Sequence, residues 1–158
     1  MSLTFLNVTK EFEKIINDLV NNLKLRNNIF VHRDFHVSNL MLVKKRIGII
    51  DSQDALIGNR ANDLASFVDD VRLKTSESLK KKMFNFYLST NKNINKKKFK
   101  NDFEILSVLR NLKIIGIFSR LAIRDGKIKY LKLIPYAWKL ISIRINKKKV
   151  FKYLNDLL

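Results

Sequence analysis

The chain has 158 residues, no cysteine and a formal net charge of +18, and 46% of its residues are hydrophobic. This length suits one domain with one sizeable core. The missing cysteines exclude disulfides and thiolate zinc sites. No stretch is long and apolar enough to span a membrane, and the first residues lack the basic segment and apolar core of a secretory signal. We therefore expect a cytoplasmic protein.

The positive charge first suggests a polyanionic partner such as nucleic acid or an anionic membrane. The lysine-rich groups, however, are spread over residues 44–45, 80–82, 96–98 and 147–149, without interleaved aromatic residues. Lys, Asn and Ile are frequent throughout, as A+T-rich codons would produce. We interpret the charge as compositional and expect neither a specific nucleic acid nor a membrane as partner, with a basic nucleic-acid-binding protein as a less favoured alternative.

The first third of the chain predicts one helix followed by short strands. Apolar residues recur at helical spacing over about residues 9–25, which predicts an amphipathic helix with Thr9 as its N-cap. The apolar run at 29–31 predicts a buried strand. The runs 40–43 and 47–50 are separated by three basic residues and predict a β-hairpin.

The remainder predicts helices, because glycine and proline are scarce there. A first helix begins near residue 62, with Asp63 as its cap. Further helices are expected over residues 76–88, 96–122, 135–145 and 147–157, with a turn at 124–127. The fold class is therefore α+β and mainly helical. We expect a single domain, 1–158, made of the first helix, catalytic and metal loops at 29–58 and a helical bundle at 62–158.

The segment richest in chemistry places three polar side chains around the predicted hairpin. Asp34 precedes the hairpin by a few residues, Asn39 stands at its start and Asp51 at its end. Phosphoryl transfer needs such an arrangement, because magnesium prefers hard oxygen ligands and a carboxylate can take the proton of the attacking hydroxyl. Each residue alone also fits a structural role, as a turn carboxylate or a turn amide. Together they favour a kinase site.

The string His32-x-Asp34-x-His36-x-x-Asn39 resembles the catalytic loop of aminoglycoside and choline kinase-like phosphotransferases. Protein kinases usually carry Lys in place of His36. Residues 47–58 and 62–70 look like the metal loop and following helix of bacterial sugar kinases in this family, and 111–141 like their C-terminal helices. Within the family, the chain looks most like the anomeric kinases of N-acetylmuramate and N-acetylglucosamine.

The resemblance implies a small-molecule kinase that uses ATP and Mg²⁺ and phosphorylates a hydroxyl of a small molecule such as an amino sugar. Asp34 would be the catalytic base, and Asn39 and Asp51 the magnesium ligands. His32 would buttress the loop and Asp63 would brace it from behind. The remaining site residues are His36 in the catalytic loop and, in supporting positions, Arg33, Gln53 and Asp54.

The sequence also departs from the family pattern. Ser52, Asn59 and Asn62 replace an aromatic residue, a proline and a tyrosine that are usual there. No glycine precedes Gly48 and no five-stranded layer fits before residue 29, so the phosphate loop, its lysine and the adenine hinge of an N-lobe are missing.

We interpret the chain as the C-terminal lobe of a protein-kinase-like fold with its N-lobe absent. A separate N-lobe or a homodimer partner would then complete it. A catalytically incompetent remnant that acts as a binding module is the alternative.

Overall fold

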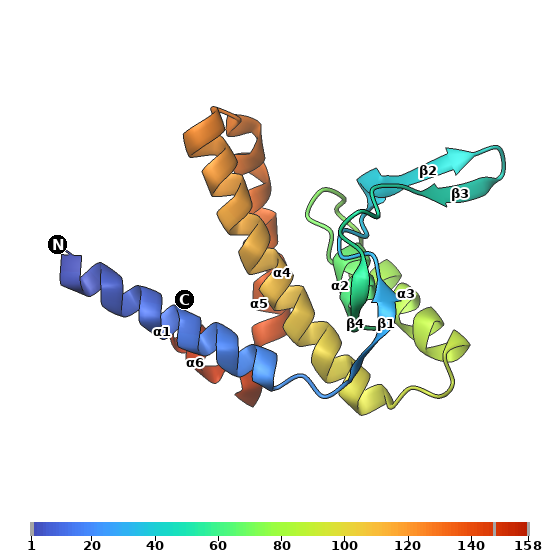
Figure 1. The fold of residues 1–158 in the computed structure, drawn as a ribbon, viewed down its shortest axis with the longest axis horizontal. Helices are drawn as coiled ribbons and strands as arrows, with labels where there is room; N and C mark the ends of the chain where they lie inside the picture. Colours follow the sequence, from blue (N-terminus) through green and yellow to red (C-terminus); the bar gives the residue numbers. More distant parts are fainter. Residues whose placement is uncertain (1, 147, 158) are drawn as a thin grey trace.

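The computed structural model describes residues 2–146 and 148–157, with side chains from residue 10 onward. The fold is mainly helical and carries two small two-stranded sheets, as expected for an α+β protein (Figure 1). The elements in chain order are α1 (Ser2–Asn21), β1 (Asn27–Val31), the 3₁₀ turn η1 (Val37–Asn39), β2 (Leu40–Val43), β3 (Arg46–Ile49), β4 (Leu56–Asn59), α2 (Asn62–Val68), α3 (Glu77–Thr90), α4 (Lys96–Asp125), η2 (Ile128–Leu133), α5 (Ile134–Ile145), η3 (Lys149–Phe151) and α6 (Lys152–Leu157). Within the described residues, no helix is both long and apolar enough to cross a membrane.

Helix α4 is the axis of the structure, and its 30 residues span about 45 Å. It begins where the Asn95 side chain accepts a hydrogen bond from the Lys98 N–H. It ends at Gly126, whose φ of 64° closes the helix in the left-handed conformation that glycine adopts without strain. Residues 124 and 125 still belong to α4, so the turn predicted at 124–127 is confirmed only at 126–127. Both ends of this long helix follow from local capping chemistry.

Three apolar clusters lie along α4. The first joins α4 to α1, α5 and the C-terminal segment, the second to α2 and α3, and the third to η2 and α5. Their most deeply buried side chains on α4 are Phe99, Ile105, Val108 and Phe118. Burial of each such side chain contributes roughly 1.5–3 kcal/mol. The helix therefore connects packing groups that are far apart in the sequence.

Both sheets are antiparallel. In the β2–β3 hairpin Leu40 pairs with Ile49, and β1 pairs with β4 so that Val31 lies opposite Leu56. The hairpin projects away from the helices, and Leu42 at 78% exposed shows that this sheet has no core behind it (Figure 1).

Most predicted elements are confirmed, including the hairpin and the helices at 76–88, 96–122 and 135–145. The strand at 29–31 is present within β1 but is not buried as expected, because Phe30 is 65% exposed and only Val31 is buried. The bounds of the first helix were wrong: α1 begins at Ser2 and ends at Asn21, so Thr9 lies inside it and is not its N-cap. Strand β4 was not predicted, because it is short and contains a glycine. The last helix is shorter than expected, since η3 precedes α6; residue 147 lies outside the described residues.

Asp63 is not a helix cap either. Helix α2 begins at Asn62, its N-cap position is Ala61, and no side chain caps it. The Asp63 carboxylate is used elsewhere, because both of its oxygens accept hydrogen bonds from the backbone that follows β1. These two tertiary hydrogen bonds outweigh the local preference of an aspartate for capping the helix.

Candidate active site

The loop between β1 and η1 holds the Asp34 carboxylate at the surface, where 45% of the side chain is exposed. Two buried neighbours position it. His36 Nε2 lies 3.2 Å from Asp34 Oδ2, and Asn39 Nδ2 donates to the Asp34 carbonyl at 2.9 Å and to Oδ2 at 3.4 Å. The sequence motif thus forms one compact hydrogen-bonded loop in which a carboxylate faces solvent on a fixed base.

Nearby charges act on the Asp34 carboxyl. Burial works to raise its pKa, but His36 and the guanidinium of Arg110, 3.5 Å from Oδ1, outweigh burial, so the pKa lies below the ordinary value. The pKa of His36 is lowered by burial and by Arg72, only partly offset by Asp34 and Asp70. At neutral pH the pair is therefore an ionised carboxylate beside an uncharged imidazole.

Asn39 and Asp51 lie at adjoining strand ends. The Ile50 N–H donates to the Asn39 carbonyl at 3.1 Å, which places Asp51 one residue beyond that pairing. Among the described residues, neither Asn39 Oδ1 nor the exposed Asp51 carboxylate takes part in a hydrogen bond or ion pair. Two hard oxygen donors without partners suit magnesium, which keeps several waters and takes few protein ligands. No group of three or more His, Asp or Glu side chains in the described ranges offers another arrangement for a metal.

His32 and Asp63 hold the loop from the inner side. The His32 Nε2–H donates to the Ile50 carbonyl at 2.9 Å, which ties the catalytic loop to the residue before Asp51. Asp63 accepts from the backbone N–H of His32 at 2.7 Å and of Arg33 at 3.0 Å. These contacts connect the loop that carries Asp34 with the segment after β3 that carries Asp51.

Two site residues have left-handed backbone conformations that favour glycine. Arg33 has a φ of 68° and Asp51 a φ of 64°. Each conformation costs a non-glycine residue about 1 kcal/mol, and such outliers cluster at functional sites. In this chain Arg33 directly precedes Asp34, and Asp51 is one of the two oxygen donors.

The other predicted residues make fewer contacts within the site. The Arg33 guanidinium reaches the Asp54 carbonyl at 3.5 Å, and both residues line a cavity beside Asp34. Gln53 is exposed and, among the described residues, has no hydrogen-bond partner. Ser52 is exposed as well, and its carbonyl accepts from the Ala55 N–H within a turn. The metal loop therefore lacks a buried aromatic anchor at this position.

The cavity beside Asp34 has a volume of about 250 Å³. It contains residues that the sequence did not indicate, from the end of α2 and from α4. Asp70 accepts from the Val37 N–H at 3.3 Å and pairs with Arg72, so the end of α2 supports the catalytic loop. In the sequence, the pair Asp69-Asp70 followed by Arg72 was the signal for this support of the loop. The cavity is lined by Arg33, Asp34, Asp54, Arg72, Arg110, Lys113, Ile114, Ile117 and Phe118.

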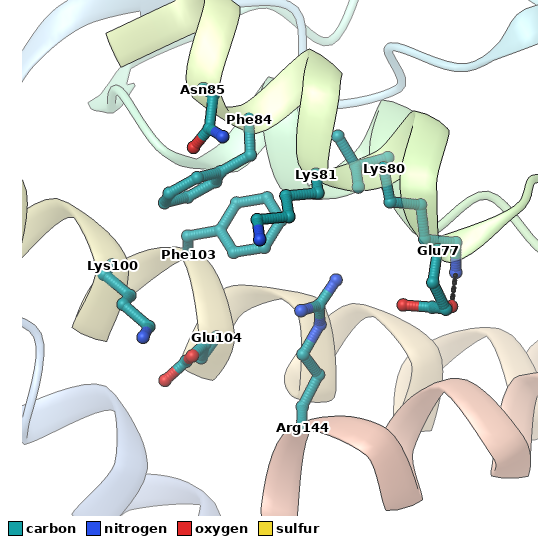
Figure 2. A pocket seen from close by; sticks show the side chains of 10 residues that line it. Glu77, Lys80, Lys81, Phe84, Asn85, Lys100, Phe103, Glu104 and Arg144 are labelled. Carbon is teal, nitrogen blue, oxygen red and sulfur yellow. Dashed lines mark ion pairs between the residues drawn. The ribbon is translucent and has the colours of Figure 1, made fainter.

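A second cavity, of about 380 Å³, lies between α3, α4 and α5 (Figure 2). Its floor is formed by Phe84 and Phe103, and it contains none of the predicted site residues. Two of its cations, Lys80 and Arg144, are engaged with the fully buried Asp69 at 3.2 and 2.9 Å. Lys80 and Arg144 therefore serve packing between helices. Three of the predicted site residues, Arg33, Asp34 and Asp54, line the smaller cavity instead.

Asp102 accepts four hydrogen bonds behind the site. Its carboxylate is fully buried and accepts the backbone N–H groups of Lys24 and Leu25 at 2.8 and 2.9 Å. It also accepts the side-chain amides of Asn59 at 2.7 Å and Asn101 at 3.0 Å. The segment before β1 and the end of β4 are thus joined to α4 at one point. This role explains Asn59, which stands where the family usually has proline.

Comparison with known proteins shows the family of the chain. A family model described as the phosphotransferase enzyme family matches residues 4–95, which include the catalytic loop, the hairpin and α2. The chain belongs to this family. It is 35% identical over 130 residues to an N-acetylmuramate/N-acetylglucosamine kinase of Neisseria meningitidis, 32% over 120 residues to one of Caulobacter vibrioides, and 31% over 153 residues to one of Pseudomonas aeruginosa.

The match covers most of this chain but only part of each relative. The aligned regions comprise 73%, 78% and 93% of the chain, against 33%, 39% and 45% of the Caulobacter, Neisseria and Pseudomonas aeruginosa proteins. The chain therefore spans less than half the length of these curated relatives. More than half of each relative has no counterpart in the 158 residues.

Proposed function

We propose that the chain is the catalytic and metal-binding lobe of an ATP-dependent sugar phosphotransferase, within a protein-kinase-like fold. The observation that carries the proposal is the Asp34 carboxylate, which is exposed, ionised and fixed by His36 and Asn39 beside a cavity. The relatives are named as kinases of amino sugars, which supports an amino sugar as acceptor. A separate N-lobe or a homodimer partner would hold the nucleotide base.

In this proposal Asp34 accepts the proton of the attacking sugar hydroxyl or orients that hydroxyl. Its lowered pKa keeps it ionised at neutral pH, and the uncharged His36 donates a hydrogen bond to it without neutralising it. Arg110 fixes the other carboxylate oxygen from α4. The chain therefore contributes a carboxylate of fixed position and charge, and positioning and electrostatic stabilisation are the main requirements of phosphoryl transfer.

Asn39 and Asp51 would hold Mg²⁺, since both present oxygen donors without partners at adjoining strand ends. A bound magnesium ion neutralises charge on the transferred phosphoryl group. His32 and Asp63 keep the two strand ends together through the Ile50 carbonyl and the loop N–H groups. We propose positioning roles for them, with Arg33, Gln53 and Asp54 around the rim.

Two measurements test the proposal. Manganese, added as a paramagnetic probe, should broaden the NMR signals of Asn39 and Asp51 before others. Broadening centred on Asp69 and Asp70 would place the metal elsewhere. In a form that includes the nucleotide-holding lobe, Asp34→Asn should lower transfer by several orders of magnitude while the protein stays folded, because proton acceptance and orientation are lost together. Near-normal turnover would refute the assignment of Asp34.

The alternative is a binding module without catalysis, and it is also compatible with an alignment that covers less than half of each relative. It predicts a folded chain whose Asn39 and Asp51 signals do not respond to manganese. The geometry favours catalysis, because a module without catalysis has no need for two strained residues and two unpartnered oxygen donors at one place.

A further inference from the structure

The larger cavity, between α3, α4 and α5, is lined by two helix faces that repeat one pattern (Figure 2). On α3, Lys81 stands three residues before Phe84, and on α4, Lys100 stands three residues before Phe103. Residues three apart lie on the same face of a helix, so each helix presents an ammonium group beside an aromatic ring. The two rings meet edge to face, with their centres 4.9 Å apart. The cavity thus has an aromatic floor and one lysine from each helix.

The two acidic residues that line this cavity already have cationic partners. Glu77 Oε1 lies 3.5 Å from Lys80 Nζ, and Glu104 Oε1 lies 2.7 Å from Lys148 Nζ. Lys80 is itself buried, and only 4% of its side chain is exposed. Neither acid therefore pairs with the other lysines at the cavity, and Lys80 is not available to a ligand.

Three cationic groups remain available at the cavity. Lys81 and Lys100 are exposed, and neither forms an ion pair with any described residue. Arg144 donates from Nε and Nη2 to the Asp69 carboxylate at 2.9 and 3.0 Å, whereas its Nη1 forms no hydrogen bond with any described residue. Its guanidinium points from α5 toward the floor and lies 5.0 Å from the centre of the Phe103 ring (Figure 2). Asp69 thus fixes the guanidinium in place and leaves N–H groups that suit an anion.

We propose that this cavity is a second ligand site, which binds a small aromatic anion with its flat apolar part on the two rings and its anionic group at Lys81, Lys100 and Arg144. The volume of about 380 Å³ lies within the roughly 300–1,000 Å³ of small-molecule sites. A cationic ligand would be repelled by the two unpaired lysines, and a neutral one would leave them unused. The cavity shares no lining residue with the one beside Asp34, so the inference does not depend on the proposed function.

Calorimetry with three probes tests the inference. 2-Naphthoate has both flat rings and a carboxylate, 2-naphthalenemethanol lacks the charge, and acetate lacks the rings. Naphthoate should bind about tenfold more tightly than either of the others, and added salt should reduce its advantage over the alcohol. Equal affinities of naphthoate and the alcohol would overturn the inference. Absence of naphthoate binding at millimolar concentrations would overturn it as well.

An NMR titration with 2-naphthoate locates the probe. The ring signals of Phe84 and Phe103 should shift first, because the naphthalene rings would lie against them. The smaller cavity also carries cations, among them Arg110 and Lys113, and could attract the same anion. Shifts centred on these two residues would place the probe there and would contradict the inference.

Lysine substitutions identify the charge contacts. Lys81→Met and Lys100→Met should each weaken naphthoate binding about threefold and leave the alcohol unchanged, because one exposed charge contributes modestly. Lys82→Met and Lys97→Met are the matched controls, since both lysines are exposed on the same two helices and do not line the cavity. They should change neither affinity. An equal loss in the controls would mean that the net charge of the surface attracts the probe, and the proposed site would be refuted. Unchanged naphthoate binding in Lys81→Met and Lys100→Met would refute it too.

Discussion

Replacing Asp102 by asparagine should destabilise the protein strongly, although the two side chains have nearly the same size. All four partners of the Asp102 carboxylate are N–H donors. Asparagine offers one accepting oxygen and one donating amide, so one pair of partners then faces a donor. Either Lys24 and Asn101 or Leu25 and Asn59 lose their acceptor.

The magnitude follows from the burial. A hydrogen bond to a charged acceptor contributes roughly 1.5–3 kcal/mol, and a buried donor without an acceptor carries a penalty. With the side chain fully buried, loss of two such bonds should lower the free energy of unfolding by about 3–5 kcal/mol. This is a large part of the roughly 5–15 kcal/mol typical of whole proteins.

Urea unfolding followed by circular dichroism measures this change as a lower midpoint at constant slope. Asp156→Asn is the matched control, because Asp156 is exposed and, among the described residues, forms no hydrogen bond. It should shift the midpoint little. A loss below about 1 kcal/mol for Asp102→Asn would show that water or a flipped amide replaces the lost acceptor, and that Asp102 does not hold β4 and the segment before β1 to α4.

Three further predictions use the same structure. Gly58→Ala should lower the free energy of unfolding by about 1–3 kcal/mol, because a Cβ there would lie 2.6 Å from Val31 Cγ2. Gly116→Ala has open space around it in α4 and should instead raise that free energy by roughly 0.5–1 kcal/mol. A lower urea midpoint for Gly116→Ala than for Gly58→Ala would contradict this packing. Burial works to raise the pKa of Asp69, but Arg144, Ser107 and Lys80 outweigh it and lower the pKa, so stability present at neutral pH should be lost as pH falls below about 4; Asp69→Asn should be less stable at pH 7 and show a flatter acid dependence. The NMR signals of His36 should titrate below the ordinary histidine range, whereas a midpoint at or above it would mean that Asp34 outweighs burial and Arg72.

The catalytic loop could be predicted because its contacts are local. His36 and Asn39 contact Asp34 within a few residues, and the hairpin register brings Ile50 to Asn39. Short sequence separations leave few alternative arrangements, so residue type and spacing are informative there. The hairpin pattern consequently predicted that Asn39 and Asp51 lie at neighbouring strand ends, whereas the catalytic and metal-binding roles of these residues stay predictions.

The supports of the site could not be predicted in the same way. Arg110 reaches Asp34 from another helix, and Asp102 reaches the segment before β1 across 77 and 78 residues. Periodicity places such residues on a helix but does not say which distant group they meet. Asp63 shows the same limit, because its sequence position suggested a cap whereas its carboxylate binds the backbone of His32 and Arg33. A local sequence pattern does not reveal when a distant backbone group binds a side chain in place of the local partner.

Helix α4 also determines when the active site can form during synthesis. The ribosome releases the loop that carries Asp34 well before Asp102 and Arg110, which hold its surroundings in place. Until α4 emerges, β4 and the segment before β1 lack their link to the helix. Contacts between residues so distant in sequence form slowly, because the intervening chain must be ordered first. The nascent protein thus passes through a period in which the residues of the candidate site have been synthesised but lack their supporting contacts. Chaperone binding would be most useful during this period.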